Sequence, residues 1–195
     1  MNETRAARAG EKRQQILLTI AEMLERPESV KVTTALLARQ LDVSEAALYR
    51  HFASKAQMYE GLIEFIESGM FSVIGQIEAA EEAGLKQAEA VVASLLRFAQ
   101  KNRGLTRVLV GDALVHENPR LQARINQLLD RLEATLRQCL KVAAAQGALP
   151  ASHDFAAHAD MLVCHVVGRW QRFVKSGFRD DPLRHWPAQW PLLAR

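Results

Sequence analysis

The segment from Thr33 to Lys55 constrains the fold of this chain more than any other part of the sequence. It reads T-T-A-L-L-A-R-Q-L-D-V-S-E-A-A-L-Y-R-H-F-A-S-K. Thr33 or Thr34 can cap a helix, because a side-chain oxygen at that position can accept from free backbone N–H groups. Small and apolar residues follow at helical spacing, which predicts a short helix with one buried face. These residues are Ala35, Leu36, Leu37, Ala38 and Leu41.

A turn and a second short helix are predicted next. The turn is residues 41–43, and Ser44 can cap a helix that extends to His51. Ala47 and Leu48 can face the interior, so the other residues of this helix are left on the outside. Two short helices with a brief turn between them are typical of a helix-turn-helix motif. The second helix of such a motif enters the DNA major groove by its N-terminal end.

Several residues of this segment are candidates for DNA contact. Alanines let the helix backbone approach thymine methyl groups, and hydroxyl groups can donate to phosphate oxygens. Glu45 can accept from the N4 amino group of cytosine or orient a neighbouring base, and both roles stay open. Lys55 begins a helix, whose free N–H groups can hold a phosphate, whereas His51 and Phe52 are expected in the core. The predicted DNA-binding residues are Thr33, Thr34, Ser44, Glu45, Ala46, Ala47, Tyr49, Arg50 and Lys55.

Hydrophobic periodicity predicts helices along the rest of the chain, and no segment shows the two-residue period of a strand. Pro27 is expected to end the first helix, Asn118-Pro119 is a strong helix start, and Pro187 and Pro191 limit regular helix in the tail. The predicted fold class is therefore all-α, with a helix-turn-helix domain over residues 1–58 and a helical domain over 59–195. The predicted long helices are 8–25, 55–83, 85–101, 118–146 and 154–176, with a loop at 102–104 and a short helix at 105–116.

Composition excludes several classes of protein. The net charge of +3 is a mild excess, so basic residues must act by their placement: they cluster before position 14 and beside the motif, at Arg5, Arg8, Lys12, Arg13 and Lys31. No apolar run is long enough for a membrane span, and no signal peptide is recognisable, so a cytoplasmic protein is expected. Cys139 and Cys164 lie in apolar helical stretches and are expected to be free, buried thiols.

Enzymatic and metal chemistry is not favoured by the residues present. His158 and His165 lie on one predicted helix, but their spacing is not that of a chelating pair four residues apart. No nucleophile motif, glycine-rich phosphate loop or pair of carboxylates in an evident cleft stands out. We expect neither a cofactor nor catalysis. A metal-responsive enzyme or sensor that uses these histidines is the least favoured of the functions considered.

The sequence resembles a known family at several places. L-A-R-Q-L-D-V-S-E-A-A-L-Y-R-H-F-A-S-K resembles the DNA-binding signature of TetR-type regulators, in which L-Y-x-H-F-x-S-K closes the domain. The segments L-I-E-F-I-E at 62–67, N-R-G-L-T-R at 102–107 and R-L-Q-A-R-I-N-Q-L-L-D-R-L-E at 120–133 are similar to nucleoid-occlusion members of this family. The resemblance implies a homodimer that binds palindromic double-stranded DNA and is associated with the nucleoid.

The resemblance also implies how two copies would pair. The last two long predicted helices carry apolar stripes at three- and four-residue spacing, and from the residues alone these stripes suit either an internal core or a contact between chains. In the family, this pair of helices forms a four-helix interface with its copy. The dimer-interface residues predicted on that basis are Leu128, Leu132, Val166 and Trp170.

A surface for a protein partner is the last implication. In nucleoid-occlusion proteins, a face of the long helix and its neighbour binds the C-terminal tail of the tubulin-like division protein FtsZ. From sequence alone Phe65 suits the core, but the resemblance makes it a partner contact. The predicted partner-binding residues are Phe65, Arg97, Lys101, Asn102 and Arg103.

The function that the resemblance implies is nucleoid occlusion. The alternative function is a transcriptional repressor whose ligand fills an apolar cavity lined by residues such as Phe98, Met161 and Trp170.

Overall fold

The structure is a computed structural model that describes residues 2–26, 32–115 and 117–195, with side chains from residue 10 onward. Helices make up all of its regular elements in these ranges, which confirms the predicted all-α class. The elements are α1 (Asn2–Glu25), α2 (Thr34–Gln40), α3 (Glu45–Tyr49), α4 (Lys55–Ala80), α5 (Gly84–Lys101), α6 (Arg103–Leu109), the 3-10 turn η1 (Asp112–Leu114), α7 (Pro119–Ala145), α8 (Phe155–Lys175) and α9 (Trp186–Leu193).

The chain divides into two compact units whose bounds differ from the predicted domains 1–58 and 59–195. The first unit comprises Met1–Ile66 and Asn102–Arg124, and the second comprises Glu67–Lys101 and Ile125–Arg195. The difference arises because α6 packs on α1. A segment that follows α5 in the sequence therefore belongs structurally with the N-terminal helices.

Close packing of α6 on α1 depends on Gly104. A Cβ atom at this position would overlap the carbonyl oxygen of Ala21, so only glycine allows the two backbones to approach so closely. The prediction that residues 102–104 form a loop was wrong, since α6 already begins at Arg103 and Asn102 alone separates it from α5. Glycine was read as a helix breaker here, but its role is contact between helices.

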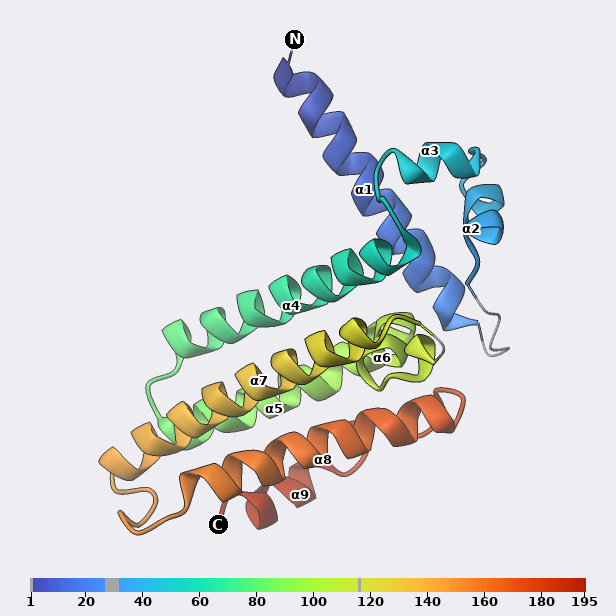
Figure 1. Ribbon diagram of the computed structural model, residues 1–195. Coiled ribbons are helices and arrows are strands. Elements are labelled where there is room, and N and C mark those ends of the chain that lie inside the picture. The colour runs from blue at the N-terminus through green and yellow to red at the C-terminus, as the bar shows by residue number, and fades with distance from the viewer. Residues whose placement is uncertain (1, 27–31, 116) are drawn as a thin grey trace. The chain divides into compact units, whose positions relative to one another are not determined.

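The second unit is built around α5, α7 and α8. Figure 1 shows α8 running alongside α5 and α7, with α9 against α8. Trp170 of α8 is fully buried, and its Nε1 donates to the carbonyl oxygen of Leu95 in α5 at 3.0 Å. Gly84 begins α5 where a Cβ atom would overlap the backbone of α7 at Cys139 and Ala143. These contacts produce a dry interior between the three helices.

Local capping rules placed several helix ends correctly. The side chain of Asn118 accepts from the backbone N–H of Arg120 at 3.0 Å, and α7 begins at Pro119. Asp154 caps α8 by accepting from the N–H groups of residues 156 and 157. Gly147 and Gly177 follow α7 and α8 with positive φ values of 79° and 63°. Each of these ends depends on residues that lie within a few positions of one another.

Other predicted ends were wrong. The first helix begins at Asn2 rather than at residue 8, and α4 ends at Ala80; Pro27, expected to end the first helix, lies outside the described residues. The tail forms α9 although it contains two prolines. Pro187 lies in the first turn, where no N–H partner is needed. Trp186 and Trp190 are both buried, with ring centroids 5.5 Å apart, so their packing stabilises this short helix.

Candidate nucleic-acid interface

The helix-turn-helix predicted at residues 33–51 is present, and its two helix starts are capped by the predicted side chains. Thr33 Oγ1 accepts from the N–H of Leu36, and Ser44 Oγ accepts from the N–H of Ala47, both at 3.2 Å. Asp42 has a φ of 52°, a left-handed conformation that Asp tolerates better than most residues. The turn therefore reverses the chain sharply between α2 and α3.

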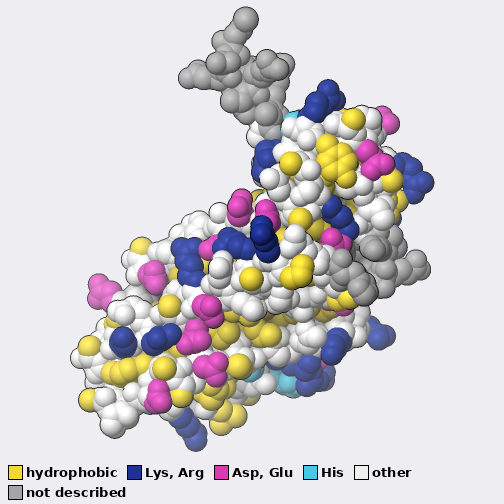
Figure 2. All heavy atoms as spheres, in the orientation of Figure 1, with side chains coloured by type: hydrophobic (Ala, Val, Ile, Leu, Met, Phe, Trp, Pro, Cys, Tyr) yellow, Lys and Arg dark blue, Asp and Glu magenta, His cyan; other side chains and the backbone are white. Residues whose placement is uncertain are grey.

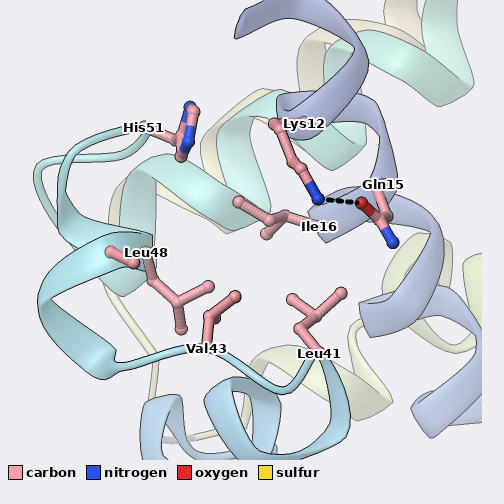
Figure 3. Close-up of a pocket in the computed structure, with 8 residues that line it drawn as sticks. Lys12, Gln15, Ile16, Leu41, Val43, Leu48 and His51 are labelled. Atoms are coloured by element: carbon pink, nitrogen blue, oxygen red, sulfur yellow. Dashed lines mark hydrogen bonds between the residues drawn. The ribbon is translucent and has the colours of Figure 1, made fainter. Parts of the chain in front are cut away.

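Apolar contacts hold this motif on α1. Figure 3 shows Leu41, Val43 and Leu48 pointing toward Ile16, while Lys12 donates to Gln15 at 2.9 Å on one side. The cavity that these residues line has a volume of only about 40 Å³. Ligand pockets for small molecules usually have volumes of several hundred Å³. This cavity is thus a packing gap under the motif, too small for an effector.

The outer face of α3 is available to DNA, as predicted. Tyr49 is 46% exposed, Ala47 is half-buried, and Leu48 is 1% exposed. The other members of this face are also exposed: Ser44, Glu45, Ala46 and Arg50. Small side chains near the N-terminal end of a helix allow its backbone to come close to base edges in the major groove.

Two predicted DNA-binding residues have partners within the protein that the sequence did not indicate. Thr34 does not cap α2; its hydroxyl donates to Glu45 Oε2 at 2.6 Å and so connects the start of α2 with the start of α3. The ammonium group of Lys55 forms an ion pair with the carboxylate of Glu117. Both side chains are therefore oriented by an internal contact in the absence of DNA.

Of the two residues after α3 that were expected in the core, Phe52 is buried and His51 is only half-buried. Phe52 is 1% exposed, and the guanidinium carbon of Arg13 lies 4.2 Å from the centroid of its ring. Arg13 Nη1 also donates to the carbonyl oxygen of His51 at 2.6 Å. The sequence singled out Arg13 as part of a basic cluster, whereas its role here is to join α1 to the loop after α3. The side chains of Arg5, Arg8 and Lys31, from the same prediction, lie outside the described residues.

On the face seen in Figure 2, the described charged side chains do not separate into a basic patch. On the surface seen in Figure 2, Lys and Arg side chains are interspersed with Asp and Glu side chains. This agrees with the small net charge of +3. Affinity for DNA must therefore depend on a few placed contacts rather than on a broad positive surface.

The four residues predicted at the dimer interface require a correction. Leu128, Leu132, Val166 and Trp170 are each no more than 1% exposed within a single chain, so they form its core and have no surface to offer a second copy. Periodicity identified an apolar face of each helix correctly but did not show what covers it. On α8 the residues that remain accessible are others, including Met161, which is 42% exposed, and Cys164.

Phe65 lies on the surface rather than in the core. It is 38% exposed while its neighbour Ile66 is fully buried, so α4 turns Phe65 outward. In the first unit, Asn102 and Arg103 are half-buried and exposed respectively. In the second unit, Arg97 and Lys101 are exposed on the last turns of α5.

The cavity that a ligand-responsive repressor would need is not supported by the residues expected to line it. Trp170 is fully buried and hydrogen-bonded to the backbone of α5, so it fills the interior of the second unit. Met161 faces outward. Of the three residues proposed to line a ligand cavity, Trp170 therefore fills the interior and Met161 points away from it.

The histidines and cysteines are explained by packing. His158 Nε2 lies 2.6 Å from the carbonyl oxygen of Leu193, and its Nδ1 lies 2.7 Å from Nε2 of His153. Burial is the main cause that lowers the pKa of His158. Within the part of the chain that the structure describes, no group of three His, Cys, Asp or Glu residues is arranged to hold a metal.

Cys139 is buried as predicted, and burial raises its pKa to about 11. Cys164 is exposed, contrary to prediction.

Comparisons with known proteins agree with this geometry. The family model described as bacterial regulatory proteins, tetR family, matches residues 30–62. The model described as tetracyclin repressor-like, C-terminal domain, matches residues 82–195. Among solved structures, a TetR transcription regulator from Haloarcula marismortui aligns with a TM-score of 0.81 and 14% identity over 95% of this chain and 97% of its own. The capped, outward-facing α3 and this fold define a helix-turn-helix DNA-binding regulator.

Relatives that match nearly the whole chain narrow the assignment. A protein named nucleoid occlusion factor SlmA from Vibrio cholerae is 46% identical over 94% of this chain and 94% of its own length. Proteins of the same name from Marinomonas sp. (strain MWYL1) and Aliivibrio fischeri are 43% and 45% identical over 95% and 94% of the chain, and 94% of each relative is covered. The chain belongs to the TetR family and, within it, to the group of these nucleoid occlusion factors.

Proposed function

We propose that this protein is a nucleoid occlusion factor: a homodimer that binds palindromic DNA on the chromosome and there antagonises assembly of the division protein FtsZ. The observation that supports DNA binding most directly is the outer face of α3. Ser44 caps it, small side chains line its start, and Tyr49 is exposed at its end. The names of the relatives extend this proposal from DNA binding to nucleoid occlusion.

A dimer follows from the length of the reading helix. With only five residues, α3 can contact few base pairs, so one copy offers little discrimination. Two copies related by two-fold symmetry would read two half-sites about one helical turn apart, roughly 34 Å, or a multiple of this distance. Because the predicted interface residues are buried, we propose that the exposed face of α8, which includes Met161 and Cys164, contacts the second copy instead.

The FtsZ-binding part of the proposal rests on the exposure of the predicted residues, each taken within its own unit. Phe65 offers an accessible aromatic ring, which is a common anchor for a peptide. Arg97, Lys101 and Arg103 are exposed cations, each of which would attract acidic side chains of an FtsZ tail, and Asn102 precedes Arg103 in the sequence. Several dimers on one stretch of DNA would raise the local concentration of this weak site, so DNA binding alone could strengthen FtsZ capture.

Two titrations on one protein sample test the proposal. Wild-type protein is titrated with a duplex selected by it from a random library, and separately with a peptide of the FtsZ C-terminal tail. We expect binding in both, and we expect Phe65→Ala and Lys101→Asp to lose the peptide while they keep DNA affinity. Leu192→Ala serves as a control for removal of an exposed apolar side chain, since Leu192 is 64% exposed and outside the proposed site. If the wild-type protein binds DNA but no tail peptide, the nucleoid-occlusion part is wrong and a DNA-binding repressor becomes the better account.

A further inference from the structure

Lys55 and Glu117 form an ion pair that crosses a long distance in the sequence. Lys55 is the first residue of α4, and Glu117 lies 62 residues later, just before α7. The side chain of Lys55 is 23% exposed and that of Glu117 is 13% exposed. Water therefore screens the pair only in part. The ammonium group of Lys55, which lies near the proposed DNA-binding helix in the sequence, is already paired with a carboxylate.

The position of Lys55 is suited to a phosphate. Ser54 caps α4 by accepting from the N–H of Gln57 at 3.2 Å, so the first N–H groups of α4 point out of the helix start. The recognition helix α3 ends only six positions before Lys55. Contacts to phosphate from such flanking positions orient a recognition helix on the duplex. A phosphate bound here and the carboxylate of Glu117 would require the same ammonium group.

The surroundings of the pair keep the carboxylate close to Lys55. The ring of Tyr59 lies 5.6 Å from the ammonium nitrogen on one side. Burial, and then the negative charge of Glu117, raises the pKa of Tyr59, so its phenol stays neutral and offers no competing charge. Glu117 is itself held between η1 and the capped start of α7 at Asn118. This carboxylate is thus a part-buried neighbour of Lys55.

We propose that Glu117 competes with a DNA phosphate for Lys55, so that the ion pair holds the DNA-free state and is exchanged for a phosphate contact when DNA binds. The inference rests on the proposed DNA-binding function and adds a residue that restrains it. Linkage is reciprocal: anything that draws Glu117 away from Lys55 raises DNA affinity, and bound DNA releases Glu117.

A double-mutant cycle tests the competition. The variants are Glu117→Gln, Lys55→Gln and the double variant, titrated with a mixed-sequence duplex, whose binding depends only on phosphate contacts, and with the duplex selected by wild type. Glu133→Gln is the matched control, because Glu133 is also an ion-paired carboxylate, bonded to Arg137 at 2.9 Å, and its replacement gives the same change in net charge. Thermal melting of each variant confirms that it is folded.

We expect Glu117→Gln to bind both duplexes about two- to fivefold more tightly, the range expected from removing a partly exposed ion pair. Lys55→Gln should bind more weakly, with a slope of log affinity against log salt reduced by about one. In the Lys55→Gln background the effect of Glu117→Gln should vanish, and Glu133→Gln should match wild type. Should Glu117→Gln be unfolded, Glu117→Asp, which keeps the charge but shortens its reach, is expected to bind more tightly than wild type by a smaller factor.

Two results would overturn the inference. Unchanged or weaker binding by folded Glu117→Gln would show that Glu117 does not compete and instead only positions Lys55. A gain that persists without Lys55, or that Glu133→Gln reproduces, would show a general charge effect. These outcomes differ from failure of the proposed function, in which wild-type protein binds neither duplex at low salt.

Discussion

The helices α3 and α8 show two opposite ways of building a functional surface. α3 has five residues, most of them exposed, and is held by a cap and by one buried leucine, Leu48. α8 has 21 residues, and its apolar face is buried against the interior of the second unit, with Trp170 at the centre. Exposed residues of α3 such as Tyr49 can thus change at little cost to folding, whereas Val166 and Trp170 of α8 are already buried in the core.

The largest effect expected from this comparison separates two substitutions that look alike in the sequence. Leu128→Glu places a carboxylate in the core of the second unit, where it has no partner, and should lower the free energy of unfolding by roughly 4 kcal/mol or more. Met161→Glu places the same group on the exposed face of α8 and should leave the chain folded but monomeric. Chemical denaturation and sedimentation distinguish the two, and a folded monomeric Leu128→Glu would contradict the assignment of Leu128 to the core.

A smaller loss of stability is expected from Trp170→Phe. The variant keeps an aromatic ring but removes the indole N–H that donates to the carbonyl oxygen of Leu95, and it leaves part of the indole volume empty. Together these should reduce the free energy of unfolding by about 2–3 kcal/mol. Urea denaturation measures the change. The exposed aromatic Phe65 is the matched control, since Phe65→Leu should alter stability by no more than about 0.5 kcal/mol.

For substitutions on α3, we expect a larger effect on DNA affinity than on the free energy of unfolding. Tyr49→Ala should weaken binding to the selected duplex by about 1–3 kcal/mol if the tyrosine contacts a base or phosphate, with a change in stability within about 0.5 kcal/mol. Ser44→Ala should show both effects, because it also removes the cap of α3. Titration and melting of both variants provide the test. Equal loss of stability in the two would mean that Tyr49 has a structural role.

The smallest effect concerns pH and the end of α9. Burial lowers the pKa of His158 below its usual value, so the unfolded chain takes up a proton at a higher pH than the folded chain does. Stability from this group is therefore complete above about pH 6.5 and is lost as the pH falls toward the lowered value. Melting curves between neutral and mildly acidic pH should show this loss, and His158→Gln should reduce it. An identical pH profile in the variant would assign the dependence to other groups.

Sequence reasoning succeeded where structure depends on neighbouring residues. The caps at Thr33 and Ser44 were predicted because the capping oxygen and its N–H partner lie within three positions of each other. The outward direction of Tyr49 followed from helical periodicity in the same way.

The errors share a different cause, which is contact between distant segments. Nothing near Gly104 in the sequence indicates that Ala21 lies against it, so a helix contact was read as a loop. An apolar stripe on α7 shows that one face is covered, but the same stripe suits a core and a dimer interface. The pairing of Lys55 with Glu117 likewise has no local signal, since 62 residues separate the two side chains.

The shortness of α3 has a consequence for how specificity is maintained. A helix of five residues does not persist in water on its own, because the first turn is costly to form and there is little length to extend it. Backbone amides of α3 should therefore exchange with solvent at rates set by opening of the contacts among Leu48, Ile16 and Leu41, not by the helix itself. Faithful selection of a DNA sequence would in this sense depend on the apolar side of α3, which packs on α1.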